Sequence, residues 1–439
     1  MTSHEALILV SAWFAVFLIL GQSVAIVLMG AGIVGMFAMM GSRLFDGLLA
    51  ADIVGAASSY SLSIISLYLL MAQFLLRGRV VEDLFRVGYR LAGKRRFPLG
   101  AATIVSGGML GAVSGFVSVS GSGAATSAAL AVMAGPQLQQ VGYTKRFAVS
   151  LASVSGSLAA IIPPSLIMIF YGSLTLVPVG HLFIGSMIPG LLCILCYIGC
   201  LWVFGEVEPG AAPAESEADT ALPTSAVAAF IFVVVLMFVI FGGIYGGVFT
   251  AGEAGGLGAF TALVGMTALR RIGLRDIFNS LVDSVKVTSM LMIIVIGAQA
   301  FGRFLSLSRA PRELLEAVEP LLGQPTVLVA LMLLAFFIGG LLLESAAVMV
   351  LLIPIILPVL EAAQVDLLWF GVMACFMISL GLLTPPVGLA TYAACAAVRH
   401  PVGPIFRTTG LFALVAAVIV SLIMVEIPGV VTWLPSQIQ

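Results

Sequence analysis

Long apolar runs alternate with short polar connections along the whole chain. Continuous runs occur at about 5–27, 28–45, 52–76, 182–204, 225–249, 252–269, 286–304 and 405–427. A helix needs about 20 predominantly apolar residues to cross a bilayer, and most of these runs approach or exceed that length. The pattern therefore predicts an all-α polytopic membrane protein.

Glycine or proline interrupts four further apolar stretches, at 99–142, 146–173, 326–360 and 364–394. The first contains Ser-Gly-Ser-Gly at 120–123 and the third Glu-Ser-Ala at 344–346, whereas the second and fourth each contain a Pro-Pro pair. Backbone outside a helix is tolerated at membrane depth only where it is buried in protein or lines a cavity. We expect the first and third stretches to be re-entrant helical hairpins, and the second and fourth to be broken helices.

Charge is sparse and unevenly placed. Residues are 61% hydrophobic and 9% charged, and the net charge of −1 argues against a general binder of nucleic acid or anionic surfaces. The connection at 77–96 carries seven basic residues against Glu82 and Asp83, which places it in the cytoplasm. The Ala/Pro/Glu-rich segment at 206–223 has no basic residue and indicates a disordered linker between two halves.

The two halves are similar to each other at a fixed offset of 222 residues. The shift places Ala124-Ala125 on Ala346-Ala347, Pro136 on Pro358, Leu158 on Leu380, and Pro163-Pro164 on Pro385-Pro386. Five crossings are expected between the two hairpins, and an odd number inverts the second half relative to the first. Ten spans and two hairpins then leave both termini outside. Inverted repeats with interrupted helices are typical of secondary transporters.

This pattern divides the chain into six segments. They are first-repeat scaffold helices with the basic connection (1–98), the first half of a transport domain with one hairpin and one broken helix (99–173), a closing span and acidic linker (174–224), second-repeat scaffold helices (225–325), the second half of the transport domain (326–396), and a C-terminal span (397–439).

The proline pairs indicate what the hairpin tips face. Proline lacks the N–H that would bond the carbonyl four residues earlier. The pairs should release the carbonyls of Ala159, Ala160, Gly381 and Leu382, and such oxygens suit a dehydrated Na⁺, while half-helix N-termini favour an anion. A proline kink repaired by a neighbouring serine or threonine is the alternative. Two pairs in register, each 41 residues after a polar tip, favour the functional interpretation.

Four segments resemble one transporter family. They are Ser120 to Gly172, GGIYGGVFTAGEAGG (Gly242 to Gly256), LLLESAAVMVLLIPIILPVL (Leu341 to Leu360) and GLLTPPVGL (Gly381 to Leu389). Together they resemble the DctM-like large membrane subunit of TRAP transporters, the tripartite ATP-independent periplasmic carriers. The resemblance implies an elevator-type carrier in the bacterial inner membrane, driven by Na⁺. It also implies a small four-span DctQ-like subunit and a periplasmic DctP-like solute-binding protein that delivers an organic anion, commonly a carboxylate.

The resemblance also implies site residues. Two or more Na⁺ ions are expected, one between the first tip and the break before Pro163, and another between the second tip and the break at 381–384. The implied metal ligands are Ser120, Ser122, Ser155, Gly156, Ala159, Ala160, Glu344, Ser345, Ala346, Gly381, Leu382 and Thr384. The implied substrate-binding residues are Ser120, Gly121, Ser122, Gly123, Ser345 and Thr384. Pro163, Pro164, Pro385 and Pro386 break the helices.

Other chemistry is weaker. Glu253 lies in an apolar region, either as a functional carboxylate or as a helix-capping residue paired with Thr250. The GxGxxG match at 30–35 has no preceding strand and indicates close helix packing, and the chain has no Walker A motif for ATP. A membrane-embedded serine hydrolase would need a base near a tip serine, yet the three histidines lie near predicted span ends. A self-sufficient Na⁺-coupled carboxylate carrier of similar architecture is the nearer alternative.

Overall fold

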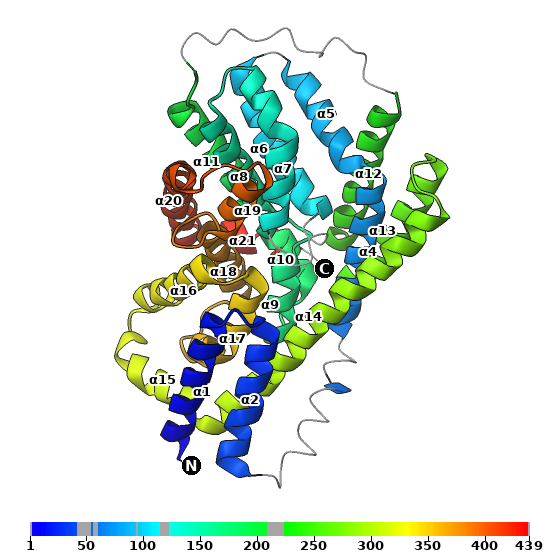
Figure 1. The fold of residues 1–439 in the computed structure, drawn as a ribbon. Helices are drawn as coiled ribbons and strands as arrows, with labels where there is room; N and C mark the ends of the chain where they lie inside the picture. The colour runs from blue at the N-terminus through cyan, green and yellow to red at the C-terminus, as the bar shows by residue number, and fades with distance from the viewer. Residues whose placement is uncertain are drawn as a thin grey trace.

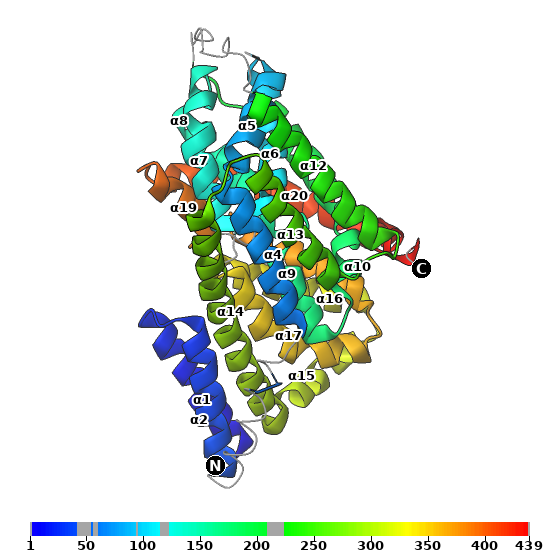
Figure 2. The ribbon, with the colours of Figure 1, turned by 90° about the vertical axis from the view of Figure 1, so that its right-hand side faces the viewer.

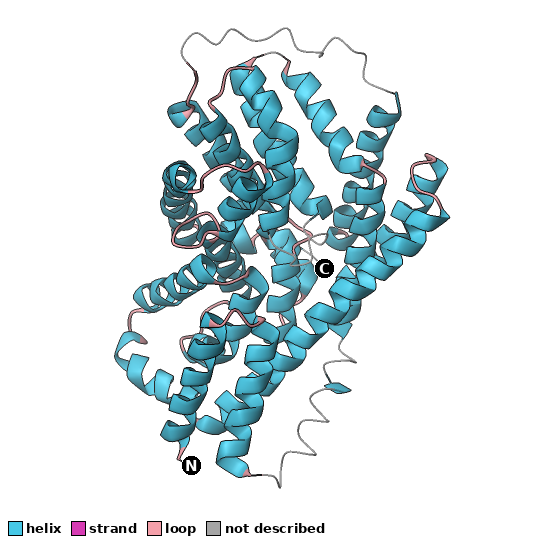
Figure 3. Cartoon of the chain, in the orientation of Figure 1, coloured by secondary structure: helices cyan, strands magenta, loops and turns pink. Residues whose placement is uncertain are grey.

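The computed structural model describes residues 2–41, 54–55, 60–93, 95–114, 123–208 and 224–437. In this part of the chain every regular element is a helix (Figure 3), so the all-α prediction is confirmed. The first-half helices are α1 (Ser3–Ile19), α2 (Val24–Met40), α4 (Tyr60–Arg77), α5 (Val80–Ala92), α6 (Arg96–Ser114), α7 (Gly123–Gln140), α8 (Lys145–Ser157), η2 (Leu158–Ala160), α9 (Leu166–Thr175), α10 (Val179–Gly185) and α11 (Met187–Phe204). Most of the acidic linker predicted at 206–223, namely residues 209–223, lies outside the described residues.

The second half is helical in the same way. Its helices are α12 (Thr224–Tyr245), α13 (Ala251–Ala268), α14 (Leu274–Ser308), α15 (Ala310–Val318), η4 (Glu319–Leu321), α16 (Pro325–Leu342), α17 (Ser345–Ala362), α18 (Leu367–Gly381), α19 (Leu389–Ala397), α20 (Gly403–Glu426), α21 (Gly429–Thr432) and η5 (Pro435–Gln437). Adding 222 to the bounds of α7 gives those of α17, and the same shift carries the start of α8 onto the start of α18.

Six helices in the described residues are long and apolar enough to cross a membrane. They are Val179–Phe204, Thr224–Tyr245, Leu274–Ser308, Pro325–Leu342, Ser345–Ala362 and Gly403–Glu426, and α4 with α5 makes a seventh if this pair, bent by 62°, is one span. Shorter apolar helices, among them Val24–Met40 and Leu367–Gly381, account for part of the difference from the expected ten spans. The number of spans and the re-entrant course of the hairpins stay predictions.

The long helix α14 packs against helices from both ends of the molecule. In Figures 1 and 2, α14 runs obliquely along the molecule, with α1 and α2 beside its lower end and α4 and α13 near its upper part. A Cβ atom on Gly32 would lie 2.5 Å from the Ala300 carbonyl carbon, and one on Gly35 would lie 2.4 Å from the Phe304 ring. Small residues therefore let α2 approach α14 closely, which confirms the packing interpretation of the GxGxxG match.

The basic connection contains a packed helix that the sequence analysis did not predict. Residues 80–92 form the amphipathic helix α5, which buries an apolar face that includes Leu84 and Phe85, and also buries Asp83. The Arg271 guanidinium donates hydrogen bonds to the Asp83 carboxylate, to the Gly78 carbonyl (3.0 Å) and to the Ser225 carbonyl (2.6 Å). A buried carboxylate needs such a partner, so this segment is a packed part of the fold and not a simple loop.

Candidate functional site

The first broken helix is mostly buried. After α8 the chain makes the single 3₁₀ turn η2, passes Pro163-Pro164, which is a cis peptide bond, and begins α9 at Leu166. Both prolines are buried. The Ser165 hydroxyl donates a hydrogen bond of 2.7 Å to the Ala160 carbonyl. The predicted break is confirmed, but the chain itself supplies a partner for one of the released carbonyls.

The second broken helix has the same plan and a different environment. The helix α18 ends at Gly381 and α19 begins at Leu389, with a cis bond between Pro385 and Pro386. Both prolines are exposed here. The Thr384 amide donates to the Gly381 carbonyl and the Ala390 amide to the Leu382 carbonyl, each at 3.0 Å.

These contacts correct one expectation. The carbonyls of Ala160, Gly381 and Leu382 lose their helical partners as predicted, but they are not left without hydrogen bonds. Within the described residues, the Ala159 carbonyl alone among the four accepts none. Proline geometry predicts which helical bond is lost, and tertiary contacts decide what replaces it. Because a carbonyl oxygen has two lone pairs, each of the four can still contribute to a cation site.

The first hairpin approaches the first break through backbone contact. Ser120, Gly121 and Ser122 lie outside the described residues, and Gly123 begins α7. A Cβ atom on Gly123 would lie 3.1 Å from the Gly156 carbonyl oxygen, and one on Gly156 would lie 2.2 Å from the Ser127 hydroxyl oxygen. The start of α7 therefore rests on the end of α8, which brings Gly123 next to the predicted ligand Gly156. The Ser155 hydroxyl donates to the Leu151 carbonyl at 2.7 Å.

The second hairpin presents polar atoms without partners. Its tip is Leu343-Glu344, and Ser345 begins α17 with Ala346 buried behind it. The Glu344 Oε1 atom and the Ser345 hydroxyl are buried and have no hydrogen-bond partner in the described part of the chain. A Cβ atom on Gly381 would lie 2.7 Å from the Gly340 carbonyl carbon, so α16 passes directly against the second break. Buried carboxylate and hydroxyl oxygens without partners are what a cation site requires.

The two halves pack crosswise around the breaks. The helix α7 packs on α19, which follows the second break, and α17 packs on α9, which follows the first. Between them, the Ser379 hydroxyl donates a hydrogen bond of 2.8 Å to the Ser157 carbonyl, and these residues are 222 positions apart, the same offset that relates the two halves. Each hairpin is thus held against the broken helix of the other half.

A buried hydroxyl network that the sequence analysis missed joins these elements. The Ser153 hydroxyl donates to the Thr391 hydroxyl (3.2 Å), and the hydroxyls of Thr391 (3.2 Å) and Thr409 (2.9 Å) donate to the Leu383 carbonyl. The Ser127 hydroxyl donates to the Ser153 carbonyl (2.9 Å), which ties α7 to the same network. Hydroxyl residues in otherwise apolar helices were the available signal, because buried hydroxyls need partners.

One other predicted feature, Glu253, has a clear structural role. Glu253 forms a capping box at the start of α13, accepting a hydrogen bond of 2.8 Å from the Thr250 amide while its own amide donates to the Thr250 hydroxyl. In the described residues, no group of three or more His, Cys, Asp and Glu side chains could hold a metal ion. The described polar atoms at the breaks are backbone, hydroxyl and Glu344 carboxylate oxygens, and oxygen ligands suit hard cations.

The chain is similar to known transport proteins over nearly its whole length. The family model for the DctM component of the tripartite ATP-independent periplasmic transporter matches residues 11–429. A Haemophilus influenzae protein named as a TRAP transporter large permease is 30% identical, covering 84% of this chain and 85% of that protein. The C4-dicarboxylate TRAP large permease of Pseudomonas aeruginosa is 28% identical (88% and 89% covered), and the ectoine TRAP large permease of Halomonas elongata is 27% identical (90% and 91%).

The fold has solved counterparts as well. The MtrF structure from Neisseria gonorrhoeae superimposes with a TM-score of 0.65 at 13% sequence identity, covering 94% of each chain. At this identity the likeness shows the fold alone. The family match over residues 11–429, by contrast, covers all the described breaks and hairpins. This chain belongs to the DctM family of TRAP transporter large permeases, which are multi-pass membrane transport proteins and not enzymes.

Proposed function

We propose that this permease imports an organic anion, in the first instance a carboxylate, by coupling its movement to Na⁺. The observation that carries the proposal is the second hairpin tip, where Glu344 Oε1 and the Ser345 hydroxyl are buried without partners. Burying such polar atoms costs free energy unless a ligand interacts with them. The proximity of α16 to the second break at Gly381 supports a site built jointly by tip and break.

Two Na⁺ sites follow from the duplicated arrangement. The first would use the 120–123 tip with Ser155, Gly156 and the η2 carbonyls, and the second would use Glu344, Ser345 and Ala346 with Gly381, Leu382 and Thr384. The sites lie where carbonyl oxygens have lost their helical partners, and Na⁺ as a hard cation prefers oxygen ligands. When bound, the ion supplies positive charge beside the substrate, and transport is driven by its gradient and not by ATP.

Anion binding is assigned to the beginnings of α7 and α17. Both helices begin at a hairpin tip, at Gly123 and Ser345, and a helix N-terminus offers free amides and a positive dipole to an anion. Related permeases are named for C4-dicarboxylate and for ectoine, so the substrate class within the family varies with the individual transporter. We assign the rest of the recognition to the solute-binding protein.

The proposed mechanism is an elevator in which two inverted repeats share one transport domain. The matching bounds of α7 and α17, and the crosswise packing of α7 on α19 and α17 on α9, support two related halves. The hydrogen bond between Ser379 and Ser157 supports a pseudo-symmetry axis that passes near the breaks. In this arrangement hairpins and broken helices move together as one body against α2, α4, α12, α13 and α14.

The partners are a small four-span membrane subunit and a periplasmic solute-binding protein, as the tripartite family description implies. We place the complex in the inner membrane with both termini in the periplasm. Gln139-Gln140 and Arg399 then face the cytoplasm, whereas Pro311 and Gln439 face the periplasm. The basic connection at 77–96 supports this orientation.

Reconstitution tests the proposal. Proteoliposomes that contain this chain, the small subunit and the loaded solute-binding protein should take up substrate only when a Na⁺ gradient is imposed. Liposomes lacking either partner serve as the matched controls and should show background uptake. Uptake by this chain alone would identify a self-sufficient carrier, and uptake that persists without Na⁺ would exclude the proposed coupling.

A further inference from the structure

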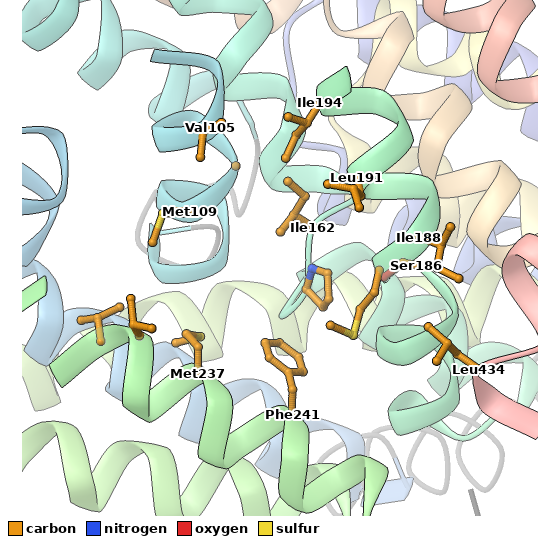
Figure 4. Close-up of a pocket in the computed structure, with 15 residues that line it drawn as sticks. Val105, Met109, Ile162, Ser186, Ile188, Leu191, Ile194, Met237, Phe241 and Leu434 are labelled. Atoms are coloured by element: carbon orange, nitrogen blue, oxygen red, sulfur yellow. The ribbon is translucent and has the colours of Figure 1, made fainter. Parts of the chain in front are cut away.

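An apolar cavity lies beside the first break. It has a volume of about 570 Å³ and is enclosed by α6, the residues before Pro164, α11 and α12, with Leu434 near the chain end. Met237 and Phe241 project from α12 into the cavity, opposite Ile162 and Leu191 (Figure 4). The cavity thus has α12 on one side and the first broken helix on the other.

The side of the cavity opposite α12 is formed around the Ile162 side chain. A Cβ atom on Gly108 would lie 2.6 Å from Ile162 Cδ1, and one on Gly190 would lie 3.2 Å from Ile162 Cγ1. The two glycines therefore provide the room in which Ile162 is seated, directly before Pro163. Any molecule in the cavity that reaches Ile162 also reaches the first break.

The described lining residues offer few hydrogen-bonding groups to water. Among the described residues that line the cavity, Ser186 alone has a polar side chain, and its hydroxyl already donates to the Phe183 carbonyl at 2.9 Å. A buried water needs two to four polar partners, and apolar cavities without them stay dry or bind apolar molecules. The chemistry of the lining selects a hydrocarbon occupant.

The opening of the cavity indicates where that hydrocarbon comes from. Its mouth includes Val234 on α12, 42% exposed, and Leu191 on α11, 55% exposed, and both helices have the length and apolarity of membrane spans. The neighbouring outward residues Val235 and Phe238 are apolar and exposed too. The cavity is therefore continuous with the hydrocarbon layer, in which lipid tails are the solvent. A spanning helix about 10 Å wide and 30 Å long fills roughly 2,000 Å³, so the cavity does not fit one.

We propose that this cavity binds one acyl chain of a membrane phospholipid, inserted laterally between α11 and α12 until it contacts Ile162. The site borders the first break but is lined by apolar side chains, and the proposal does not depend on the transported molecule. It places a lipid tail between α12 and the first broken helix.

Photochemical labelling tests the site. The full-length chain is placed in nanodiscs of phosphatidylethanolamine that carries a diazirine in the middle of one acyl chain, irradiated, and digested for peptide mass spectrometry. We expect labelling at Ile162, a partly buried residue that lines the cavity, as well as at the exposed Phe238. Labelling at Phe238 without any at Ile162 would overturn the proposal.

Matched variants sharpen the result. Val234→Trp fills the mouth of the cavity, whereas Val235→Trp makes the same change at a residue that is 54% exposed and does not line it. Labelling at Ile162 should fall to background in the first variant and persist in the second. Leu191→Trp and its control Leu195→Trp repeat the comparison from the opposite helix, so that one poorly folding variant does not decide the outcome. Equal labelling in all four would overturn the proposal.

A final experiment distinguishes a lipid from a protein segment as the occupant of the cavity. The same labelling is carried out with the small membrane subunit bound in the nanodisc. Retention of the Ile162 label supports a lipid site that belongs to this chain. Loss of the label would show that a segment of the partner occupies the cavity, and the acyl-chain proposal would then be wrong.

Discussion

The two Pro-Pro breaks are similar in sequence and unlike in their surroundings. At the first break Pro163 and Pro164 are buried, and one serine hydroxyl, from Ser165, completes the Ala160 carbonyl. At the second, Pro385 and Pro386 are exposed, and backbone amides complete the two released carbonyls, while two threonine hydroxyls donate to the next carbonyl, that of Leu383. The same Pro-Pro break is therefore buried in the first half of the chain and exposed in the second. The difference shows that the breaks supply the geometry, while each half supplies its own partners.

The largest effect is expected from variants that disrupt the close backbone packing at each break. Gly156→Val would push a side chain against Ser127 at the first break, and Gly381→Val would push one against Gly340 and Phe337 at the second. Overpacking of this kind costs about 1–3 kcal/mol or more, and here it also displaces the site. Both variants should lose Na⁺-driven uptake in proteoliposomes while still inserting in the membrane.

The control for these variants is Gly135→Val on α7, where a new Cβ atom would meet nothing within 4 Å. It should retain most of the uptake. Full uptake by Gly156→Val or Gly381→Val would show that close approach at that break is not needed, and would remove the basis of the corresponding ion site.

A more selective change addresses the second tip. Glu344→Gln keeps the shape of the side chain and removes its charge, so the Na⁺ concentration for half-maximal uptake should rise about tenfold, which corresponds to about 1.4 kcal/mol. Glu361→Gln, an exposed position at the other end of α17, is the matched control and should leave the Na⁺ dependence unchanged. Identical Na⁺ curves for Glu344→Gln and the unmodified protein would exclude this carboxylate as a ligand.

The smallest structural changes each remove one hydroxyl group that donates a hydrogen bond to a carbonyl near a break. Ser165→Ala leaves the Ala160 carbonyl without its hydroxyl partner, a loss of about 1–3 kcal/mol for a buried group. Thr409→Val removes one of two hydroxyls from the Leu383 carbonyl and leaves Thr391 in place, so it should cost about 0.5–1 kcal/mol. Thermal unfolding in detergent measures both variants. A larger loss for Thr409→Val would contradict the assigned roles.

The sequence predicted the broken helices well because their signals are local. Proline removes a particular amide, so the breaks at 163–164 and 385–386 follow from chain positions alone, and α7 and α17 begin at the predicted tips. The replacement partners could not be predicted in the same way. Thr409 reaches the Leu383 carbonyl from 26 residues away, and Ser153 reaches Thr391 across 238 residues, distances at which no local pattern operates.

The basic connection teaches a similar lesson. Its charges indicated a cytoplasmic loop, but the spacing of Val81, Leu84 and Phe85 is also that of an amphipathic helix, and α5 forms because that face is buried. Asp83 is acceptable inside because Arg271, from the other half, and Arg86, from the same helix, both pair with its carboxylate. Charge placement predicts the side of the membrane, whereas packing partners from distant sequence decide the local structure.

The central claim is that the two halves are oppositely oriented and bring their breaks to one transport site. The most direct test is the accessibility of two cysteines, Gln139→Cys after the first hairpin and Pro311→Cys before the second, to a membrane-impermeant maleimide. The natural cysteines are free, and Cys196, which is not fully buried, is first replaced by alanine. In right-side-out spheroplasts position 311 should label and position 139 should label only after lysis. Labelling of both from the same side would contradict the inverted arrangement.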